Sequence, residues 1–334
     1  MNRKYLSIGV AVLSAFLLGG LWTDYHMSMG SPLKNQETAY FEITKGQSLK
    51  AIADGLQGKG LLDRPFWFRL MAWAGNASKR MKFGEYEIPV QTTPRQLLGL
   101  FASGKVRHYG LTFIEGWTFK QMVEAMNREP GIVHQTEGKS PVEIMGLMDS
   151  PGEQAEGRFY PDTYFFSKGT ADIEILKRSY RKMQTVLADE WQAKAQGLPL
   201  HNPYEALILA SIVEKESALA EERNKIAGVF IRRLAKGMLL QTDPSVIYGM
   251  GEAYTGNIRK EDLLRDTPFN TYVHTGLPPT PISMPGIGAI RASLHPDSGA
   301  SLYFVARGDG GHVFSNTLAE HNKAVDQFQK NRHE

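Results

Sequence analysis

The sequence contains no cysteine, and this absence excludes several kinds of chemistry. Without thiols the chain forms no disulfide, no thiolate zinc site, no cysteine nucleophile and no lipid anchor on cysteine. The absence is compatible with an oxidising compartment but does not require one.

A strong charge of either sign is also missing. The 38 basic and 35 acidic residues leave a formal net charge of +3. No run of lysine and arginine follows the pattern of a nucleic-acid-binding segment, so nucleic acid is not expected as a partner. What the chain does have is length and apolar content. Its 334 residues, 42% of them hydrophobic, suffice for two or three packed domains.

The N-terminal part holds one long uncharged apolar run, YLSIGVAVLSAFLLGGLW, at residues 5–22. As a helix it would span roughly 27 Å, close to the hydrocarbon thickness of a bilayer. Arg3 and Lys4 precede it, which places residues 1–4 in the cytoplasm, and Trp22 suits the far interface. A cleaved signal peptide is the alternative, but the run is long for one and no A-x-A site follows. We therefore expect a retained transmembrane helix and then a polar linker at residues 23–38.

Residues 39–133 repeat one pattern three times: a short strand, a turn, a serine or threonine at a helix N-cap, and an amphipathic helix. Ser48 is expected to cap the first helix, and Thr93, followed by Pro94, the second. The first two units resemble a LysM-like module, a fold associated with binding N-acetylated glycans. A structural α+β subdomain without a ligand explains the pattern equally well.

Residues 134–200 are expected to form a connecting region. Its aromatic stretch EGRFYPDTYFF is explained more simply by interdomain packing than by a platform for stacking sugar rings. From residue 201 to 334, a strongly marked helix is followed by short strands and by loops rich in glycine, proline and asparagine. Loops on a rigid frame often carry functional sites, so we place the functional domain there. The pattern as a whole predicts an α+β fold.

The most informative stretch is NPYEALILASIVEKES. Asn202 is expected to cap a helix, with Pro203 at the first helical position and Glu205 in the first turn. The interior, ALILASIV, is apolar on nearly every side, so the helix should be buried. Glu214 and Glu216 stand at its end, where carboxylates are unusual unless they are paired or used in chemistry.

The two acids are predicted to point in different directions. At about 100° per residue, Glu216 falls on the helical stripe that carries Leu209, Ile212 and Val213. Glu214 lies about 200° round from it. Carboxylates placed in this way do not face each other as the pair in a two-carboxylate glycosidase does.

Burial would suit either glutamate to act as a general acid at neutral pH, because an apolar environment raises the pKa of a carboxyl group. Helical periodicity favours Glu216 only slightly. The alternative is a structural helix end in which the glutamates pair with arginines. The candidate partners are Arg223, Arg232 and Arg233.

Four stretches beginning at this helix together resemble a known family. They read ASIVEKES, EERNKIAGVFIRRLAKGMLLQTDPSVIYGMG, FNTYVHTGLPPTPISMPG and LYFVARGDGGHVFSNTLAEHNKAV. With the N-terminal anchor, the LysM-like unit and EGRFYPDTYFF, the resemblance extends over nearly the whole chain. The sequence resembles the endolytic murein transglycosylases of the MltG (YceG-like) family.

The resemblance implies a single-pass protein of the bacterial inner membrane with a periplasmic catalytic domain at residues 201–334. It implies cleavage of the β-1,4 bond between N-acetylmuramic acid and N-acetylglucosamine within peptidoglycan strands, giving 1,6-anhydro-muramyl ends. No cofactor is implied. The second acid of the family's E-K-E-S/T motif is catalytic, which carries over to Glu216 and leaves Glu214 a supporting role. An anchored enzyme of this kind would reach newly made glycan, which suggests strand termination and peptidoglycan synthases as partners.

A lytic transglycosylase needs one carboxyl group, so two diverging acids fit this chemistry. Polar loop residues are expected to bind the sugars and stabilise the cationic transition state. We expect these to be Gln241, Thr242, Asp243, Asn270, Tyr272, His312 and Asn316. A metal site at His312 and His321 is not expected, because no third ligand has suitable spacing.

Two other functions remain open. A membrane-tethered peptidoglycan-binding scaffold would do no chemistry, but it would not need an unpaired acid on a buried helix. A hydrolysing muramidase would need a second carboxylate near Glu216, for which Asp243 and Glu222 are the candidates.

Overall fold

The computed structural model describes residues 3–216 and 219–329, with side chains from residue 8 onward apart from Ser78. Residues 1–2 of the predicted cytoplasmic end, Ser217 of the E-K-E-S motif and residues 330–334 therefore lie outside the described residues. The chain forms two compact units. Unit 1 comprises residues 1–109 and 165–170, and unit 2 comprises residues 110–164 and 171–334. These boundaries differ from those expected at 133 and 200, which stay predictions.

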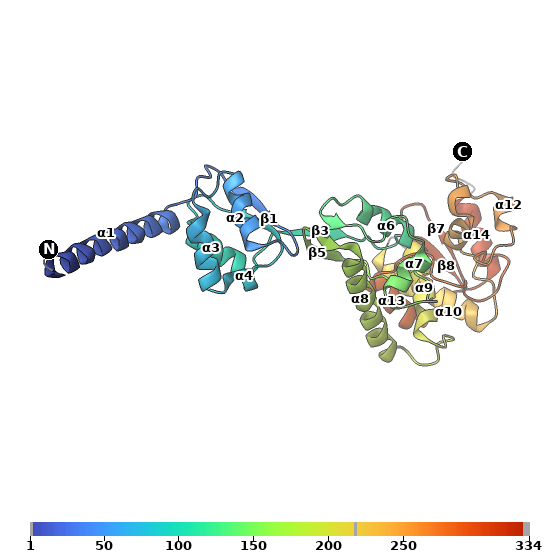
Figure 1. The fold of residues 1–334 in the computed structure, drawn as a ribbon. Helices are drawn as coiled ribbons and strands as arrows, with labels where there is room; N and C mark the ends of the chain where they lie inside the picture. The colour runs from blue at the N-terminus through green and yellow to red at the C-terminus, as the bar shows by residue number, and fades with distance from the viewer. Residues whose placement is uncertain (1–2, 217–218, 330–334) are drawn as a thin grey trace. The chain divides into compact units, whose positions relative to one another are not determined.

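The apolar N-terminal run forms helix α1, Arg3–Gly30, of which residues 8–30 are long and apolar enough to span a membrane (Figure 1). The helix thus continues through the first eight residues of the segment expected to be a linker. The reason is tertiary, because Tyr25 and Met29, one helical turn apart, pack against the core of unit 1 and Met29 is fully buried.

Unit 1 is built around the antiparallel pair of β1, Ala39–Ile43, and β2, Gly84–Ile88. Each strand leads into a helix, α2 (Leu49–Gly58) after β1 and α5 (Pro94–Ser103) after β2. Ser48 accepts a hydrogen bond from the backbone of Ala51, and Thr93 forms a capping box with Gln96, so both expected caps are confirmed. Helices α3, Pro65–Ala74, and α4, Ala77–Arg80, complete the unit.

The third predicted strand-and-helix repeat lies apart from the first two. Strand β3, His108–Thr112, is followed by helix α6, Phe119–Asn127, which belongs to unit 2 and which Thr118 caps as expected. Strand β3 pairs with β5, Thr163–Ser167, and the division between the units passes through both strands. The mixed helix-and-strand class is confirmed, whereas the LysM-like assignment stays a prediction.

Unit 2 is mainly helical. After α6 come β4 (Ile132–Val133), α7 (Pro141–Leu147), β6 (Thr170–Ala171), α8 (Asp172–Gln192), α9 (Pro203–Glu216), α10 (Arg223–Ala235), α11 (Asp243–Met250), α12 (Lys260–Leu263), α13 (Ile287–Leu294), β7 (Tyr303–Ala306), β8 (His312–Ser315) and α14 (Leu318–Phe328). Short 3₁₀ turns, Ala220–Glu222 and Gly251–Ala253, follow α9 and α11. Strand β4 pairs with β6, and β7 with β8.

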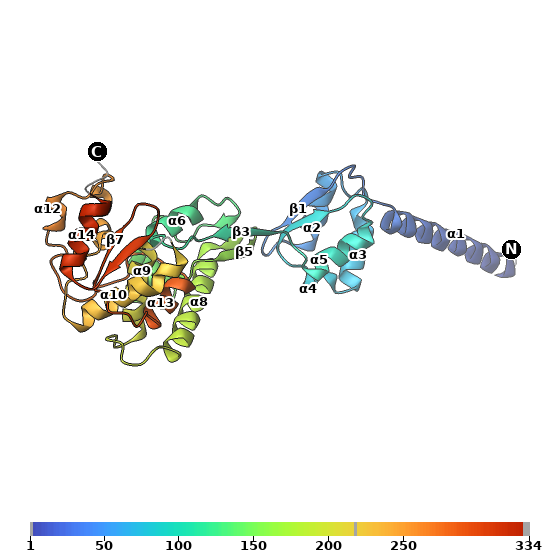
Figure 2. The same ribbon diagram turned by 180° about the vertical axis from the view of Figure 1, so that it is seen from behind.

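Helix α9 runs through the centre of unit 2. It packs against α8, α10, α11 and α13, and α9, α10 and α13 lie side by side from both viewing directions (Figure 1, Figure 2). Every residue from Ala206 to Val213 is buried, as the all-round apolar pattern predicted. The hairpin of β7 and β8 with α14 packs beside α10 and carries the segment that ends in GGHVFSN. The central helix α9 therefore places Glu214 and Glu216, at its C-terminal end, close to loops from three other parts of the chain.

Candidate active site

The start of α9 is fixed by the local hydrogen bonds that its sequence predicted. The side chain of Asn202 accepts a hydrogen bond from the backbone N–H of Glu205 at 3.0 Å. In return, the Glu205 carboxylate accepts from the backbone of His201 at 2.7 Å. The cap sets where the helix begins, and its period then sets the direction of both glutamates at its other end.

Glu216 lies at the wall of a pocket of about 540 Å³, while most of its side chain is buried. Burial raises its pKa from an ordinary value near 4.5 to about 7, and the negative charge of Asp243 acts in the same direction. A hydrogen bond from the Thr242 hydroxyl and the proximity of His312 oppose this rise. The carboxyl group therefore exchanges its proton close to neutral pH, which suits a group that first donates and then accepts a proton.

The N-terminus of α11 brings Thr242 and Asp243 to Glu216, and the loop between α12 and α13 adds Tyr272. Thr242 is buried, and its hydroxyl donates to Glu216. Asp243, the first residue of the helix, lines the pocket and accepts a hydrogen bond from the Tyr272 hydroxyl at 2.6 Å. Tyr272 lines the same pocket, so the carboxylate of Asp243 and the phenol ring of Tyr272 both lie in the pocket with Glu216.

Gln241 also lines the pocket, with its backbone in the left-handed region at φ 52°. That conformation is uncommon outside glycine and is held here by its surroundings. The Gln241 backbone N–H donates to Thr271, and its side-chain oxygen accepts from Arg233 at 3.2 Å. The strained residue turns the chain so that the following Thr242 and Asp243 meet Glu216.

His312 reaches the pocket from β8 and is held by Glu222. The Glu222 carboxylate accepts from the backbone N–H of His312 at 3.0 Å and lies 2.7 Å from its ring Nδ1. Burial acts to raise the pKa of Glu222, but the contacts with His312 outweigh it and lower the value. With Nδ1 bound to Glu222, the ring's Nε2 is left for other contacts. Glu222 is therefore engaged in orienting His312 and not free to activate a water.

Glu214 serves a different set of partners, as the helical spacing predicted. Its carboxylate accepts from the backbone of Gly286 at 2.9 Å, at the N-terminus of α13, and pairs with Arg223 of α10 at 3.3 Å. Burial nevertheless raises the pKa of Glu214. A Cβ at Gly286 would lie 1.8 Å from a carboxylate oxygen of Glu115, so only glycine fits there. Glu214 thus ties α9 to α10 and α13.

Three predicted substrate-binding residues lie outside the lining of this pocket: Thr242, which contacts Glu216 from a buried position, Asn270 and Asn316. Asn270 is fully buried, and its side-chain nitrogen donates to the backbone of Asp262, Leu263 and Arg265. The Asn270 side chain thus stabilises a backbone turn with the amide group that was expected to bind substrate. Asn316 is exposed, and its side chain accepts from Ser301 at 3.0 Å.

Sequence reasoning named Arg233 only as a possible ion-pair partner of the two glutamates, and it did not predict that Arg233 or an apolar wall lines the pocket. Arg233 is only 7% exposed, lines the pocket, and no described residue provides it with a carboxylate partner. Its guanidinium donates instead to the backbone of Leu302 and Leu240. Tyr303 and Phe304 of β7 also line the pocket. Adjacent strand residues point to opposite faces, so no local pattern predicts that both of these side chains line the pocket of Glu216.

A further carboxyl group with a raised pKa was also missed. Burial raises the pKa of Glu156, in the EGRFYPDTYFF stretch, to about 7. Its two oxygens accept from the backbone of Phe119 and from the Tyr248 hydroxyl. These contacts tie α6 to α11, so the structure gives Glu156 a positioning role in unit 2.

Fold and site together define an α+β protein with an N-terminal apolar helix and a pocket built around one protonatable glutamate. The chain belongs to the YceG-like family, whose profile matches residues 41–327.

Curated relatives agree with this assignment. The chain is 36% identical over 179 residues to an endolytic murein transglycosylase of Bacillus subtilis, covering 54% of this chain and 49% of that protein. It is 27% identical over 360 aligned positions to one of Streptococcus pneumoniae, covering 96% of this chain and 65% of that protein. The chain thus spans between about half and two thirds of these relatives.

A solved structure is also similar. The crystal structure of a yceG-like protein from Listeria monocytogenes matches 86% of this chain and 99% of its own, with a TM-score of 0.54 and 29% sequence identity. The similarity therefore covers both the fold and most of the described chain.

Proposed function

We propose that the protein is a lytic transglycosylase that cleaves peptidoglycan, the activity named for its curated relatives. The observation that carries the proposal is Glu216, a mostly buried carboxyl group with a pKa of about 7 at the wall of an open pocket. A single acid with this pKa is what the reaction requires.

In the proposed reaction the Glu216 carboxyl group first donates its proton to the glycosidic oxygen that leaves the muramyl C1. The bond from C1 to that oxygen breaks, and positive charge develops on the ring. The 6-hydroxyl of the same sugar then attacks C1 while the Glu216 carboxylate removes its proton. The product is a 1,6-anhydro ring, the acid is restored, and neither water nor a cofactor is consumed.

The pocket provides partners for the charge that develops. The Asp243 carboxylate favours a cationic sugar ring electrostatically, and Tyr272 holds that carboxylate in place. We assign Gln241 and His312 to hydrogen bonds with sugar hydroxyl or amide groups, since both line the pocket. Tyr303 and Phe304 provide the apolar surface on which a sugar ring packs.

The proposed location follows from the N-terminal helix. Residues 8–30 have the length and composition of a membrane span. With Arg3 and Lys4 on the cytoplasmic side, unit 2 and the part of unit 1 that follows α1 lie beyond the inner membrane in the periplasm. There the enzyme would cut newly made strands and so terminate them, close to the peptidoglycan synthases that extend them.

The test is to incubate the protein with purified glycan strands and to weigh the products by mass spectrometry. We expect anhydro-muramyl ends from the native protein and a loss of at least about 100-fold with Glu216→Gln, which keeps the shape but not the acid. Glu205→Gln is the matched control, because that carboxylate caps the other end of α9. Full activity in Glu216→Gln would disprove the assignment.

Asp243 gives a specific reason to keep the hydrolysing alternative. It is a second carboxylate on the same pocket, and a muramidase would use it to activate water or to attack C1. That reaction leaves reducing ends that are heavier by one water than anhydro ends. A non-catalytic scaffold would give neither product, so the same mass measurement separates all three functions.

A further inference from the structure

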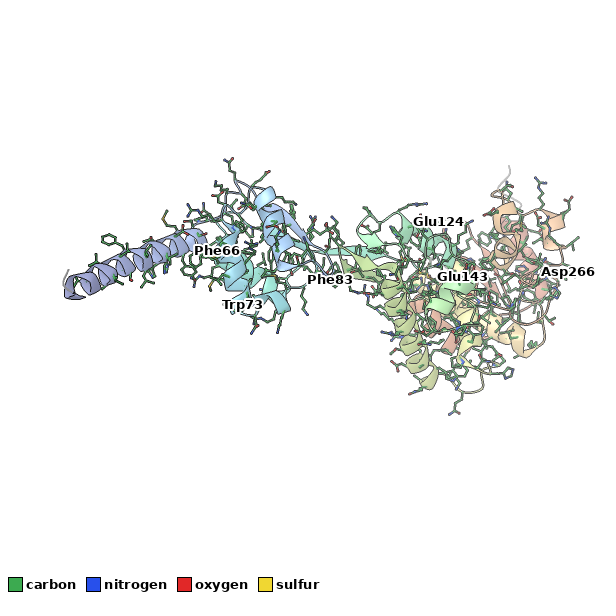
Figure 3. All side chains as sticks on the ribbon, in the orientation of Figure 1. Phe66, Trp73, Phe83, Glu124, Glu143 and Asp266 are labelled. Atoms are coloured by element: carbon green, nitrogen blue, oxygen red, sulfur yellow. The ribbon has the colours of Figure 1, made fainter. Side chains whose placement is uncertain are left out.

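Helix α3 in unit 1 exposes an apolar face that no described residue covers. Phe66, Leu70 and Trp73 are 57%, 39% and 71% exposed. Their spacing of four and then three residues places them on one side of the helix. Figure 3 labels Phe66 and Trp73 on the surface of the unit, toward the side on which α1 joins it.

This face is additional to the one that holds α3 in its own unit. Phe68 and Ala72, on the other side of the helix, are fully buried in the core of unit 1. The outer face therefore adds nothing to packing within unit 1, and three large apolar side chains in a row indicate a contact with something else.

The charged residues within α3 and in the stretch that follows it are all basic, whereas the acids at its start, Asp24 and Asp63, are paired with Arg64 and Lys34. Residues 64–84, RPFWFRLMAWAGNASKRMKFG, include five basic residues and no acidic one. Among the described ion pairs, Arg64 pairs with Asp24, while Arg69, Lys79, Arg80 and Lys82 take part in none. An apolar stripe flanked by unpaired cations has the composition of a surface that lies in the headgroup region of an anionic membrane.

The position of α3 relative to α1 fits the same partner. Asp24 of α1 accepts a hydrogen bond from the Trp67 indole N–H at 2.8 Å and pairs with Arg64, the residue before α3. Asp24 is two residues beyond Trp22, about 3 Å along the helix axis. Figure 1 shows α3 running across the end of α1 instead of continuing along it. The start of α3 is therefore held at the level where a membrane span would leave the bilayer.

We propose that the face formed by Phe66, Leu70 and Trp73 lies on the outer surface of the membrane that α1 crosses. Its partner is the interface of anionic phospholipids, with the rings and Leu70 at the acyl boundary and the cations at the phosphates. The contact adds a second attachment to that of α1 and fixes the orientation of unit 1 on the membrane. It depends on α1 as an anchor and not on the proposed catalysis.

The absence of cysteine makes a direct test possible. Full-length Leu70→Cys, labelled with an environment-sensitive fluorophore, is reconstituted in vesicles of phosphatidylcholine with phosphatidylglycerol. Lys50→Cys on α2 is the matched control, since its side chain is 74% exposed. We expect a blue-shifted label at position 70 that lipid-borne quenchers reach, and a water-exposed label at position 50. Equal exposure of the two labels to water would overturn the proposal.

Two further measurements separate lipid from other partners. The triple variant Lys79→Gln, Arg80→Gln, Lys82→Gln should weaken quenching at position 70 in vesicles containing phosphatidylglycerol, because the phosphates lose their cations. Its cleavage of purified strands should stay unchanged, since the pocket belongs to unit 2. If soluble glycan strands, and not lipid, shift the label at position 70, the face is a glycan-binding surface and the membrane proposal is wrong.

Discussion

At the scale of single residues, Glu216 is defined by neighbours that pull its pKa in opposite directions. The Thr242 hydroxyl hydrogen-bonds to the ionised form and lowers the pKa, while the charge of Asp243 raises it. A general acid must hold its proton, so activity should fall as pH rises through the Glu216 pKa of about 7.

The fall in activity above neutral pH is the alkaline limb of the pH–rate profile. Substitutions of Thr242 and Asp243 should shift this limb in opposite directions. Thr242→Val removes a hydrogen bond that favours the carboxylate, so the limb should move to higher pH. Asp243→Asn removes a negative charge, so the limb should move to lower pH. The measurement is the cleavage rate of purified strands across pH 5 to 9, a range of about two units on either side of that pKa. Shifts in the same direction would show that Glu216 does not set the limb.

Glu222 is expected to act through His312. Glu222→Gln keeps the size of the side chain but weakens the hold on the ring, so we expect about a tenfold loss of cleavage. The double variant Glu222→Gln, His312→Ala should be no slower than His312→Ala alone, because the two residues act as one unit. Losses that multiply in the double variant would show an independent role for Glu222.

At the scale of elements, the two glutamates at the end of α9 have different roles: Glu214 contributes to stability, and Glu216 is the proposed catalytic acid. Burial raises the pKa of both acids, but Glu214 is paired with Arg223 and accepts from Gly286, whereas no described ion pair includes Glu216. In the folded protein Glu216 binds its proton more tightly than in the unfolded chain. Its contribution to stability is therefore fully present below pH 4.5 and is lost as pH rises toward 7.

The two glutamine variants should consequently differ in the sign of their effect on stability. Above pH 7, Glu216→Gln should raise the free energy of unfolding by on the order of 1–3 kcal/mol, because it removes a buried charge. Glu214→Gln should lower it by about 1–3 kcal/mol, because Arg223 loses its partner. Denaturant unfolding at pH 8, about one unit above the Glu216 pKa, measures both. A destabilised Glu216→Gln would contradict this account.

At the scale of the whole molecule, the apolar helix α1 and the rest of unit 1 cannot be separated at residue 30. Tyr25 and Met29 belong to α1 but pack in the unit 1 core, and Asp24 holds the start of α3. A soluble chain that begins at Asp24 should keep these contacts, while one that begins at Ser31 loses them.

We expect the shorter chain to unfold unit 1 more easily by about 2–4 kcal/mol, the usual cost of removing a large buried side chain. Both chains should cleave purified strands at similar rates, since every residue of the pocket lies in unit 2. Thermal unfolding and the cleavage assay check the two parts. Equal unfolding of the two chains would mean that the end of α1 contributes nothing to the unit.

The sequence by itself determined the features that depend on neighbours along the chain. The apolar run of α1, the caps at Ser48, Thr93 and Asn202, and the divergence of Glu214 from Glu216 follow from local hydrogen bonds and the helical period. The same period could not show that α1 continues to Gly30, because tertiary packing of Met29 extends it.

Only the tertiary structure decided which polar residues share the pocket. Thr242 meets Glu216 across 26 residues, and Glu222 meets His312 across 90. Asn270 resembles a substrate-binding residue in sequence, yet its side chain is used by the backbone of its own turn. Such choices depend on long-range packing that places one polar group beside another, and no local pattern of residue types encodes that distance.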